Sequence, residues 1–300
     1  MKTRKPSITR RDFLSASASS WAAAAAFTPA VACATEKRSA TDTVVLGKTG
    51  LKLSRLGLGL GSHGGAVQRD LGQDGFNKLV RYAFDQGIRY FDCAQSYKTF
   101  QWLGDAVKGL PRDEIFLLSK ISGNPDKPEG VIEQQLKILQ TDYLDCMLVH
   151  CAYTATWAQD RNRLMTALDK AKATGKIRSK GVSCHSLPAL RIAAQSDWVE
   201  VNLVRVNPQG QHIDGEAQKW DVSGTDIDPV MTQIALMKKN RHGVIGMKIF
   251  ADGDFTNPDD REKSIRYALS KSEIDAVTIG FKSPAEIDEA IQRMNTALNR

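Results

Sequence analysis

The chain of 300 residues has no uninterrupted apolar stretch of the ~20 residues that a membrane-spanning helix requires. Its 5 cysteines are too few for the disulfide framework of a small secreted domain. Its 10 prolines and 23 glycines exclude a collagen-like or low-complexity chain. Hydrophobic residues make up 42% and charged residues 25%, so the composition is that of a globular protein and excludes wholesale disorder.

The net charge of +7 is unevenly distributed along the chain. More than half of the surplus lies in residues 1–33, where five basic residues accompany a single acidic residue, Asp12. The rest of the chain is close to balanced and lacks the concentrated basic surface that nucleic-acid binding requires. We therefore predict no nucleic-acid partner.

The N-terminal segment has the features of an export signal. Thr9–Leu14 resembles the twin-arginine motif, with Arg10 and Arg11 as the arginine pair. The Ala- and Ser-rich stretch that follows, Ser15–Phe27, is only weakly apolar, as this resemblance implies for leaders of the route. We predict a periplasmic or otherwise exported protein that meets the twin-arginine translocase and has no membrane span.

Small residues ahead of the globular part offer a cleavage site. We place cleavage after Ala34, so that residues 1–34 are the signal peptide and residues 35–300 form one domain. A lipid anchor at Cys33 is the alternative, which Ala30 disfavours because it is a poor residue three places before a lipidated cysteine. The cysteines of the mature chain are assigned to packing, and a disulfide between two of them is left open.

Beyond Asp42 the hydrophobic pattern alternates between short apolar runs and amphipathic stretches of helical period. The predicted strands are Leu56–Leu60, Ile88–Phe91, Ile115–Ser119, Leu144–Val149, Ser179–Val182, Val199–Val206, Gly243–Ile249 and Ala276–Ile279. The predicted helices lie near residues 70–86, 101–108, 128–140, 159–174, 187–195, 227–240, 259–270 and 284–297. A hairpin over Thr43–Leu46 and Leu51–Leu53 precedes them.

Eight alternating strands and helices predict an α/β fold, the (β/α)8 TIM barrel, with the hairpin at the barrel floor. Strands separated by helices run parallel and are covered by those helices, and eight such units close into a barrel without a free edge. The alternative is an open doubly wound sheet. That fold would place a G-x-G-x-x-G turn after the first strand, and none opens a helix there.

Four chemically complementary residues follow the ends of predicted strands, where a barrel of this type carries its functional loops. They are Asp92 and Tyr97 after the second strand, Lys120 after the third and His150 after the fourth. A tyrosine hydroxyl, with an ordinary pKa of about 10, becomes a usable acid when a neighbouring ammonium favours the phenolate. An aspartate would hold that ammonium, and a histidine could donate a hydrogen bond to a carbonyl oxygen. The set suits a proton donor for a carbonyl that accepts hydride from elsewhere.

Together these residues resemble the pattern of the aldo-keto reductases. The resemblance rests on the hairpin, Phe91–Tyr97, Ser119-Lys120 and His150, and it extends over roughly residues 43–297. It implies a nicotinamide-dependent carbonyl reductase or alcohol dehydrogenase in which Tyr97 is the general acid/base, with Lys120 tuning its pKa. It also implies that Asp92 partners Lys120 and that His150 orients the substrate.

The residues that the resemblance assigns to the nicotinamide depart from the family pattern. Ser183 keeps the usual serine after the fifth strand, whereas Cys184 stands in the place of an asparagine. The sixth strand has no glutamine for the amide, and the candidates to replace it are Asn202, Arg205 and Asn207. Met247, followed by Lys248, occupies the position of the aromatic residue that stacks on the ring, and a thioether can still pack there.

The phosphate end of the cofactor is assigned to the segment after the eighth strand. Gly280, Lys282 and Ser283 match the family's adenosine-phosphate segment, since Lys282 brings a positive charge and Ser283 begins a helix whose N-terminus attracts anions. Glu286 would repel a 2′-phosphate. Despite this repulsion, Lys282 and Ser283 lead us to expect NADP, with NAD as the alternative.

Two other functions remain open from the residues alone. A zinc-dependent hydrolase would draw its ligands from His63, His150, His185, Cys93, Cys151 and Cys184, but no pair has the spacing of a metal motif, and no metal ligand is assigned. A nicotinamide-binding module without turnover is the second alternative. For the principal interpretation we expect a small carbonyl or sugar-like substrate held by loops 61–72, 152–160 and 207–227, in which Trp157 and Trp220 could face a ring.

Overall fold

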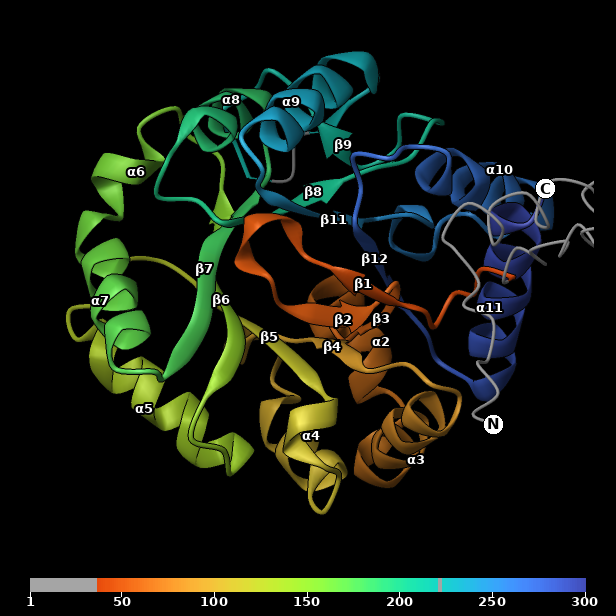
Figure 1. Ribbon diagram of the computed structural model, residues 1–300, viewed down its shortest axis with the longest axis horizontal. Helices are drawn as coiled ribbons and strands as arrows, with labels where there is room; N and C mark the ends of the chain where they lie inside the picture. Colours follow the sequence, from red (N-terminus) through yellow and green to blue (C-terminus); the bar gives the residue numbers. More distant parts are fainter. Residues whose placement is uncertain (1–36, 221–222) are drawn as a thin grey trace, which may run out of the picture. The chain divides into compact units, whose positions relative to one another are not determined.

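The computed structural model describes residues 37–220 and 223–300. The predicted signal peptide, residues 1–34, lies outside the described residues, and so does its cleavage site. Eight parallel strands form a closed barrel in the order β11-β12-β3-β4-β5-β6-β7-β8, with helices around it (Figure 1). These strands are β3 (Leu56–Gly59), β4 (Tyr90–Asp92), β5 (Phe116–Ile121), β6 (Leu144–Ala152), β7 (Ile177–Cys184), β8 (Val201–Arg205), β11 (Gly243–Met247) and β12 (Ala276–Gly280). The predicted (β/α)8 barrel is confirmed.

One main helix follows each barrel strand, as the periodicity predicted. The helices are α3 (Gly72–Asp85), α4 (Phe100–Val107), α5 (Pro128–Leu139), α7 (Asn162–Ala173), α8 (Leu187–Gln195), α9 (Asp228–Lys239), α10 (Pro258–Leu269) and α11 (Pro284–Leu298). In α3 the buried residues Phe76, Leu79, Val80 and Ala83 recur at the three- and four-residue spacing of one helix face. That face packs on the strands, so the apolar stripe determines how the helix lies against the barrel.

The predicted hairpin closes the amino end of the barrel. β1 (Thr43–Val45) pairs antiparallel with β2 (Lys52–Ser54), and η1 (Gly47–Thr49) forms part of the connection between them. Leu46 and Leu53 are buried among the side chains of the barrel interior. The Lys48 amide donates to the carbonyl of Arg241, two residues before β11, at 2.7 Å. The hairpin lies across the barrel centre in Figure 1, so its leucines act as a plug.

The barrel interior is filled by side chains from alternate strand positions. Its buried cluster, apart from the hairpin leucines, consists of Tyr90, Phe116, Leu118, Cys146, Leu148, Val201, Leu203, Ile245 and Ala276. Intervening strand residues pack outward against the helices in a second, larger cluster. The period of two therefore determines which residues at a strand's end can face the mouth.

Three segments predicted as substrate loops contain short elements. Residues 61–72 include η2 (Ser62–Gly65) and α2 (Ala66–Arg69), residues 152–160 include α6 (Trp157–Asp160), and residues 207–227 include the pair β9 (Ile213–Asp214) and β10 (Ser223–Gly224). η4 (Arg112–Glu114) precedes β5 and η5 (Ala251–Gly253) follows β11. Trp157 is buried and its ring nitrogen donates to the Ala189 carbonyl of α8, so it packs against that helix and does not face a substrate. Trp220 is 60% exposed.

Two further expectations concern cysteines and membranes. The cysteines of the described residues, Cys93, Cys146, Cys151 and Cys184, are all free thiols, and three of them are buried. The three buried thiols, Cys93, Cys146 and Cys184, pack among the apolar side chains. Over residues 37–220 and 223–300, no helix combines the length and the apolar character needed to cross a membrane.

Leu46 provides a test of the plug. We expect Leu46→Ala to lower the free energy of unfolding by about 2–5 kcal/mol, because it removes a fully buried side chain from a packed interior. Val45→Ala, at a neighbouring position that is 51% exposed, is the matched control and should change stability by less than about 0.5 kcal/mol. Urea unfolding of both variants measures the difference, and equal stabilities would contradict the plug.

Candidate active site

Three polar side chains lie one step beyond the apolar interior, at the carboxyl ends of adjacent strands. Each follows an interior residue at a distance of two positions: Asp92 follows Tyr90 in β4, Lys120 follows Leu118 in β5, and His150 follows Leu148 in β6. Because side chains alternate along a strand, all three point into the barrel mouth. Carboxyl ends of parallel strands meet at the same end of a barrel, so this part of the predicted group assembles.

Lys120 Nζ lies at the centre of the group. It donates to the Asp92 carboxylate, to the Cys93 carbonyl oxygen at 3.0 Å and to the Tyr97 hydroxyl at 3.3 Å. Tyr97 is the last residue of η3 (Gln95–Tyr97), directly downstream of β4. The Tyr97 hydroxyl accepts this hydrogen bond, so its own proton is available to another acceptor. His150 packs edge-on against Tyr97, with ring centroids 5.7 Å apart.

Two glycines make room for the tyrosine. A Cβ atom on Gly61 would lie 2.4 Å from Tyr97 Cζ and 2.7 Å from its hydroxyl oxygen. A Cβ on Gly65, whose φ is +86°, would lie 2.6 Å from the Tyr97 carbonyl oxygen. Any side chain at Gly61 would therefore displace the phenol from Lys120. These glycines lie in the segment 61–72, which the sequence predicted as a substrate loop, and they form a slot for Tyr97.

Burial and charge act in opposite directions on these groups. Burial raises the pKa of Tyr97 above its ordinary value, and the Lys120 ammonium lowers it only in part. Burial lowers the pKa of Lys120, but the neighbouring Asp92 and Tyr97 raise it by more. The net pKa lies above the ordinary value of a lysine, so the amine stays charged. The pKa of Asp92 is raised by burial, against the opposing effect of Lys120. The expected lowering by the ammonium is present, but burial outweighs it, and Tyr97 is a protonated phenol at neutral pH.

His150 is a neutral imidazole in this environment. Burial, and then the Lys120 charge, lower the pKa of His150 to about 3. Its Nδ1 lies 2.8 Å from the Ser122 hydroxyl, which fixes the orientation of the ring. With His150 neutral, Lys120 and Asp92 carry the charges of the site. The neutral imidazole can still donate or accept a hydrogen bond.

A second buried polar group lies beside the first and was only partly predicted. Arg205, two positions beyond Leu203 in β8, donates to His185 Nδ1, and its Nε lies 3.7 Å from the Asp214 carboxylate. Since a guanidinium only donates, His185 carries its hydrogen on Nε2, 3.5 Å from the Cys151 sulfur. Burial raises the pKa of Asp214 to about 7, against the opposing effect of Arg205. The sequence named Arg205 as one of several residues that could replace the missing glutamine of the sixth strand. Asp214 lies in a loop segment without a motif, so the sequence did not identify it.

The residues assigned to the nicotinamide separate into two sets. Ser183 and Met247 end the inner faces of β7 and β11, and the Ser183 hydroxyl is buried without a hydrogen-bond partner in the described structure. The structure does not bring Cys184 to the mouth, because its thiol packs in the outer cluster. Lys248, the other residue assigned to the cofactor at this end, has its ammonium paired with the Asp252 carboxylate at 2.6 Å. A buried hydroxyl without a partner can hydrogen-bond an amide and a thioether can pack on a ring, so Ser183 and Met247 suit a nicotinamide and Cys184 does not.

In the predicted phosphate-binding segment, the donors that a phosphate would use already contact the Glu286 carboxylate. Ser283 caps α11 by accepting from the Glu286 amide at 3.3 Å. The Glu286 side chain accepts from the Lys282 amide at 2.8 Å, and its carboxylate lies 3.7 Å from Lys282 Nζ. At Gly280 a Cβ would lie 1.9 Å from the Ser62 hydroxyl oxygen, so a side chain there would force the Ser62 side chain to move. The lysine and the helix start are in place, but a phosphate would meet a negative charge.

The histidines and cysteines of the zinc alternative do not assemble. In the described part of the chain, no group of three or more His, Cys, Asp or Glu side chains is arranged to hold a metal ion. The paired His185 and Cys151 are joined by Arg205, a cation that disfavours a metal. The zinc-hydrolase alternative therefore lacks a ligand set among these residues.

Comparisons with known proteins point to one family. Residues 55–216 match the profile described as the aldo/keto reductase family. The chain is 30% identical over 141 residues to methylglyoxal reductase DkgB of Salmonella typhi, an alignment that covers 44% of this chain and 52% of that protein. It is 30% identical over 199 residues to 7-acetyl-epi-neemfruitin B aldo-keto reductase of Melia azedarach, covering 58% and 60%. The chain thus spans about half the length of the curated relatives it matches.

A solved structure extends the likeness to nearly the whole fold. Aldo-keto reductase AKR11C1 of Bacillus halodurans superposes with a TM-score of 0.67 at 18% identity, over 86% of this chain and 95% of that one. At this identity the superposition establishes the barrel fold.

Proposed function

Because the chain belongs to the aldo/keto reductase family, we propose that it is an exported, nicotinamide-linked oxidoreductase that interconverts a carbonyl compound and the corresponding alcohol, with Tyr97 as the acid/base. The observation that carries the proposal is the hydrogen bond from Lys120 Nζ to the Tyr97 hydroxyl, inside a mouth that also holds Asp92 and His150. Lys120 and His150, from two strands distant in the sequence from Tyr97, both contact this tyrosine, which packing alone does not require.

The cofactor supplies or accepts the hydride at the substrate carbon. Ser183 and Met247 are the residues that would hold its nicotinamide, and Lys282 and Ser283 are those that would meet its phosphate end. Because the pKa of Tyr97 is raised above its ordinary value, the phenol is protonated at neutral pH and can act as the acid in reduction.

Proton delivery by Tyr97 leaves a phenolate, and Lys120 is the group that stabilises it. As hydride reaches the carbonyl carbon, the Tyr97 O–H bond breaks and the proton passes to the carbonyl oxygen. The ammonium 3.3 Å away then faces a full negative charge, an interaction stronger in the transition state than before it. Asp92 holds the ammonium in position, and neutral His150 supplies a hydrogen bond that orients the carbonyl. Alcohol oxidation follows the same path in reverse.

The substrate class that we propose is a small carbonyl compound, including sugar-like ones. The name of one relative, methylglyoxal reductase DkgB, supports a small carbonyl. The exposed indole of Trp220 and the polar side chains at the mouth suit a hydrophilic molecule with a flat face.

Replacing Tyr97 by phenylalanine tests the acid. We expect Tyr97→Phe to lower kcat by about 10²–10⁴-fold, since only the proton donor is removed, while the dissociation constant for the cofactor stays unchanged. Steady-state reduction of a panel of small aldehydes and ketones, followed at the nicotinamide absorbance, gives the rate. Tyr82→Phe, which removes a surface hydroxyl bonded to Asp288, is the matched control. A wild-type rate in Tyr97→Phe would refute the assignment.

Glu286 is expected to determine the choice between NADP and NAD. We propose that the enzyme uses NADP, with NAD as the alternative, and that the carboxylate at the start of α11 opposes NADP binding. Glu286→Gln should tighten NADPH binding by about fivefold and leave NADH binding nearly unchanged, because only NADPH carries the 2′-phosphate. Fluorescence titration measures both constants, and Asp288→Asn on the same helix is the control. Equal gains for both cofactors would contradict this role.

Export by the twin-arginine route rests on the leader sequence. Conservative replacement of both arginines, Arg10→Lys with Arg11→Lys, should hold the uncleaved precursor in the cytoplasm, because the route requires the arginine pair. Lys5→Arg preserves the motif and is the control. Cell fractionation with N-terminal sequencing of the exported chain measures both location and cleavage after Ala34. Unimpaired export of the double variant would contradict the proposed route.

A further inference from the structure

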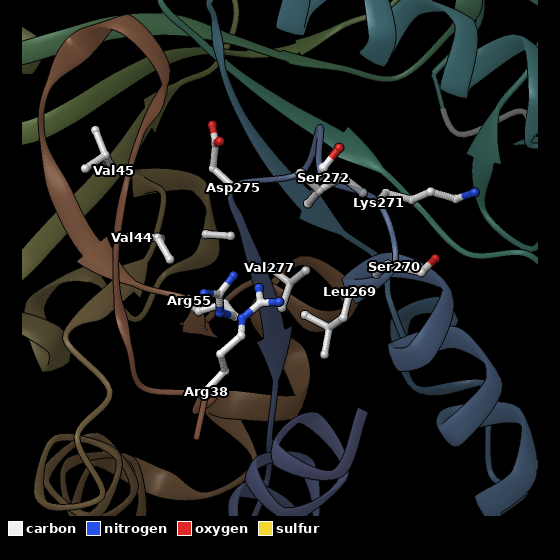
Figure 2. A pocket seen from close by; sticks show the side chains of 13 residues that line it. Arg38, Val44, Val45, Arg55, Leu269, Ser270, Lys271, Ser272, Asp275 and Val277 are labelled. Atoms are coloured by element: carbon white, nitrogen blue, oxygen red, sulfur yellow. The ribbon is translucent and has the colours of Figure 1, made fainter. Parts of the chain in front are cut away.

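A cavity of about 360 Å³ lies at the floor of the barrel, away from the candidate active site. Its walls are the hairpin strand β1, the residue Arg55 just before β3, and the connection from α10 to β12 (Figure 2). Arg55 and Asp275 each directly precede a barrel strand, whereas Asp92 and His150 stand near the strands' carboxyl ends. The cavity and the mouth are therefore at opposite ends of the barrel.

Two arginine side chains enter this cavity together. Arg38 and Arg55 both line it, and their guanidinium groups lie next to each other in the close view (Figure 2). Burial lowers the pKa of Arg55, the charge of Arg38 lowers it further, and Asp42 raises it in part. The two cations therefore lie within electrostatic range of each other, a placement that costs free energy unless an anion accompanies them.

No carboxylate of the described residues 37–220 and 223–300 forms an ion pair with either guanidinium. The Arg55 Nε atom is buried and has no hydrogen-bond partner there. Asp42 accepts the Ser39 amide at 2.7 Å. The Asp275 carboxylate, the one acidic side chain of the lining, is engaged by Lys238 Nζ at 2.8 Å and by the Val244 amide at 3.0 Å. The nearby acids are thus used elsewhere, and the donors of the arginine pair remain available.

Part of the cavity lining is apolar. Val44 from the hairpin, Leu269 at the end of α10 and Val277 in β12 line it. A guanidinium presents a planar fork of donors that matches the two oxygens of a carboxylate or phosphate. An anion alone would use the arginines and leave the apolar wall in contact with water, whereas an anion on an apolar body uses both.

We infer that this cavity binds a small organic oxyanion, with its carboxylate or phosphate between Arg38 and Arg55 and its apolar part against Val44, Leu269 and Val277. The site needs no step of the chemistry proposed at the mouth, so it stands independently of that function. Carboxylate and phosphate share the recognition chemistry, and two probes distinguish them.

Methyl NMR of the full-length chain, labelled at valine and leucine and titrated with benzoate or phenyl phosphate, tests the site. We expect saturable shifts of the Val44, Leu269 and Val277 methyl signals with one or both probes, and the tighter probe identifies the oxyanion. Inorganic phosphate, which lacks the apolar body, should bind about tenfold more weakly than phenyl phosphate. Benzamide, the neutral analogue of benzoate, should produce no saturable shift.

Matched arginine variants complete the experiment. Arg55→Gln and Arg38→Gln should each raise the dissociation constant about tenfold, because each removes charge-assisted hydrogen bonds. Arg163→Gln, at a surface pair with Asp126, should bind as the wild type does. Arg38 is exposed, so its variant keeps the test valid if Arg55→Gln fails to fold. Shifts confined to methyl groups at the mouth, or constants unchanged in both cavity variants, would overturn the proposal.

Discussion

The chemistry of the mouth depends on one buried ammonium, that of Lys120. A charge removed from water costs several kcal/mol unless it is paired and hydrogen-bonded. Here the Asp92 carboxylate pairs with it, and the Cys93 carbonyl and the Tyr97 hydroxyl accept its other hydrogen bonds. Every acceptor of this ammonium comes from β4 or the segment just after it, so the pairing of β4 with β5 holds the site together.

Burial and charge are balanced in a way that suits an acid. The closed environment that raises the pKa of Tyr97 also lowers that of His150 to about 3, because both ionised forms lose the solvation of water. The result is a phenol that keeps its proton beside a cation that would stabilise its loss. A site open to solvent would have weakened both effects, since water screens the ammonium.

The two ends of the barrel differ in what closes them. At the floor, Leu46 and Leu53 close the interior, and the arginine pair faces a separate cavity. At the mouth, the interior layer gives way to polar side chains, and Gly61 leaves the space that Tyr97 occupies. The slot depends on the absence of a Cβ atom, so its requirement is steric rather than conformational.

The sequence by itself determined the barrel, because apolar periods of two and of 3.6 residues follow directly from strand and helix geometry. It also determined that Asp92, Lys120 and His150 share one face, since each stands where a parallel strand ends. Only the tertiary structure decided that Arg205 lies beside Asp214, which comes from a loop segment after its own strand. The tertiary structure also decided that the Glu286 carboxylate accepts from the Lys282 amide, and that burial outweighs the Lys120 charge in raising the pKa of Tyr97. Those outcomes depend on loop paths, side-chain directions and the exclusion of water, which local patterns do not encode.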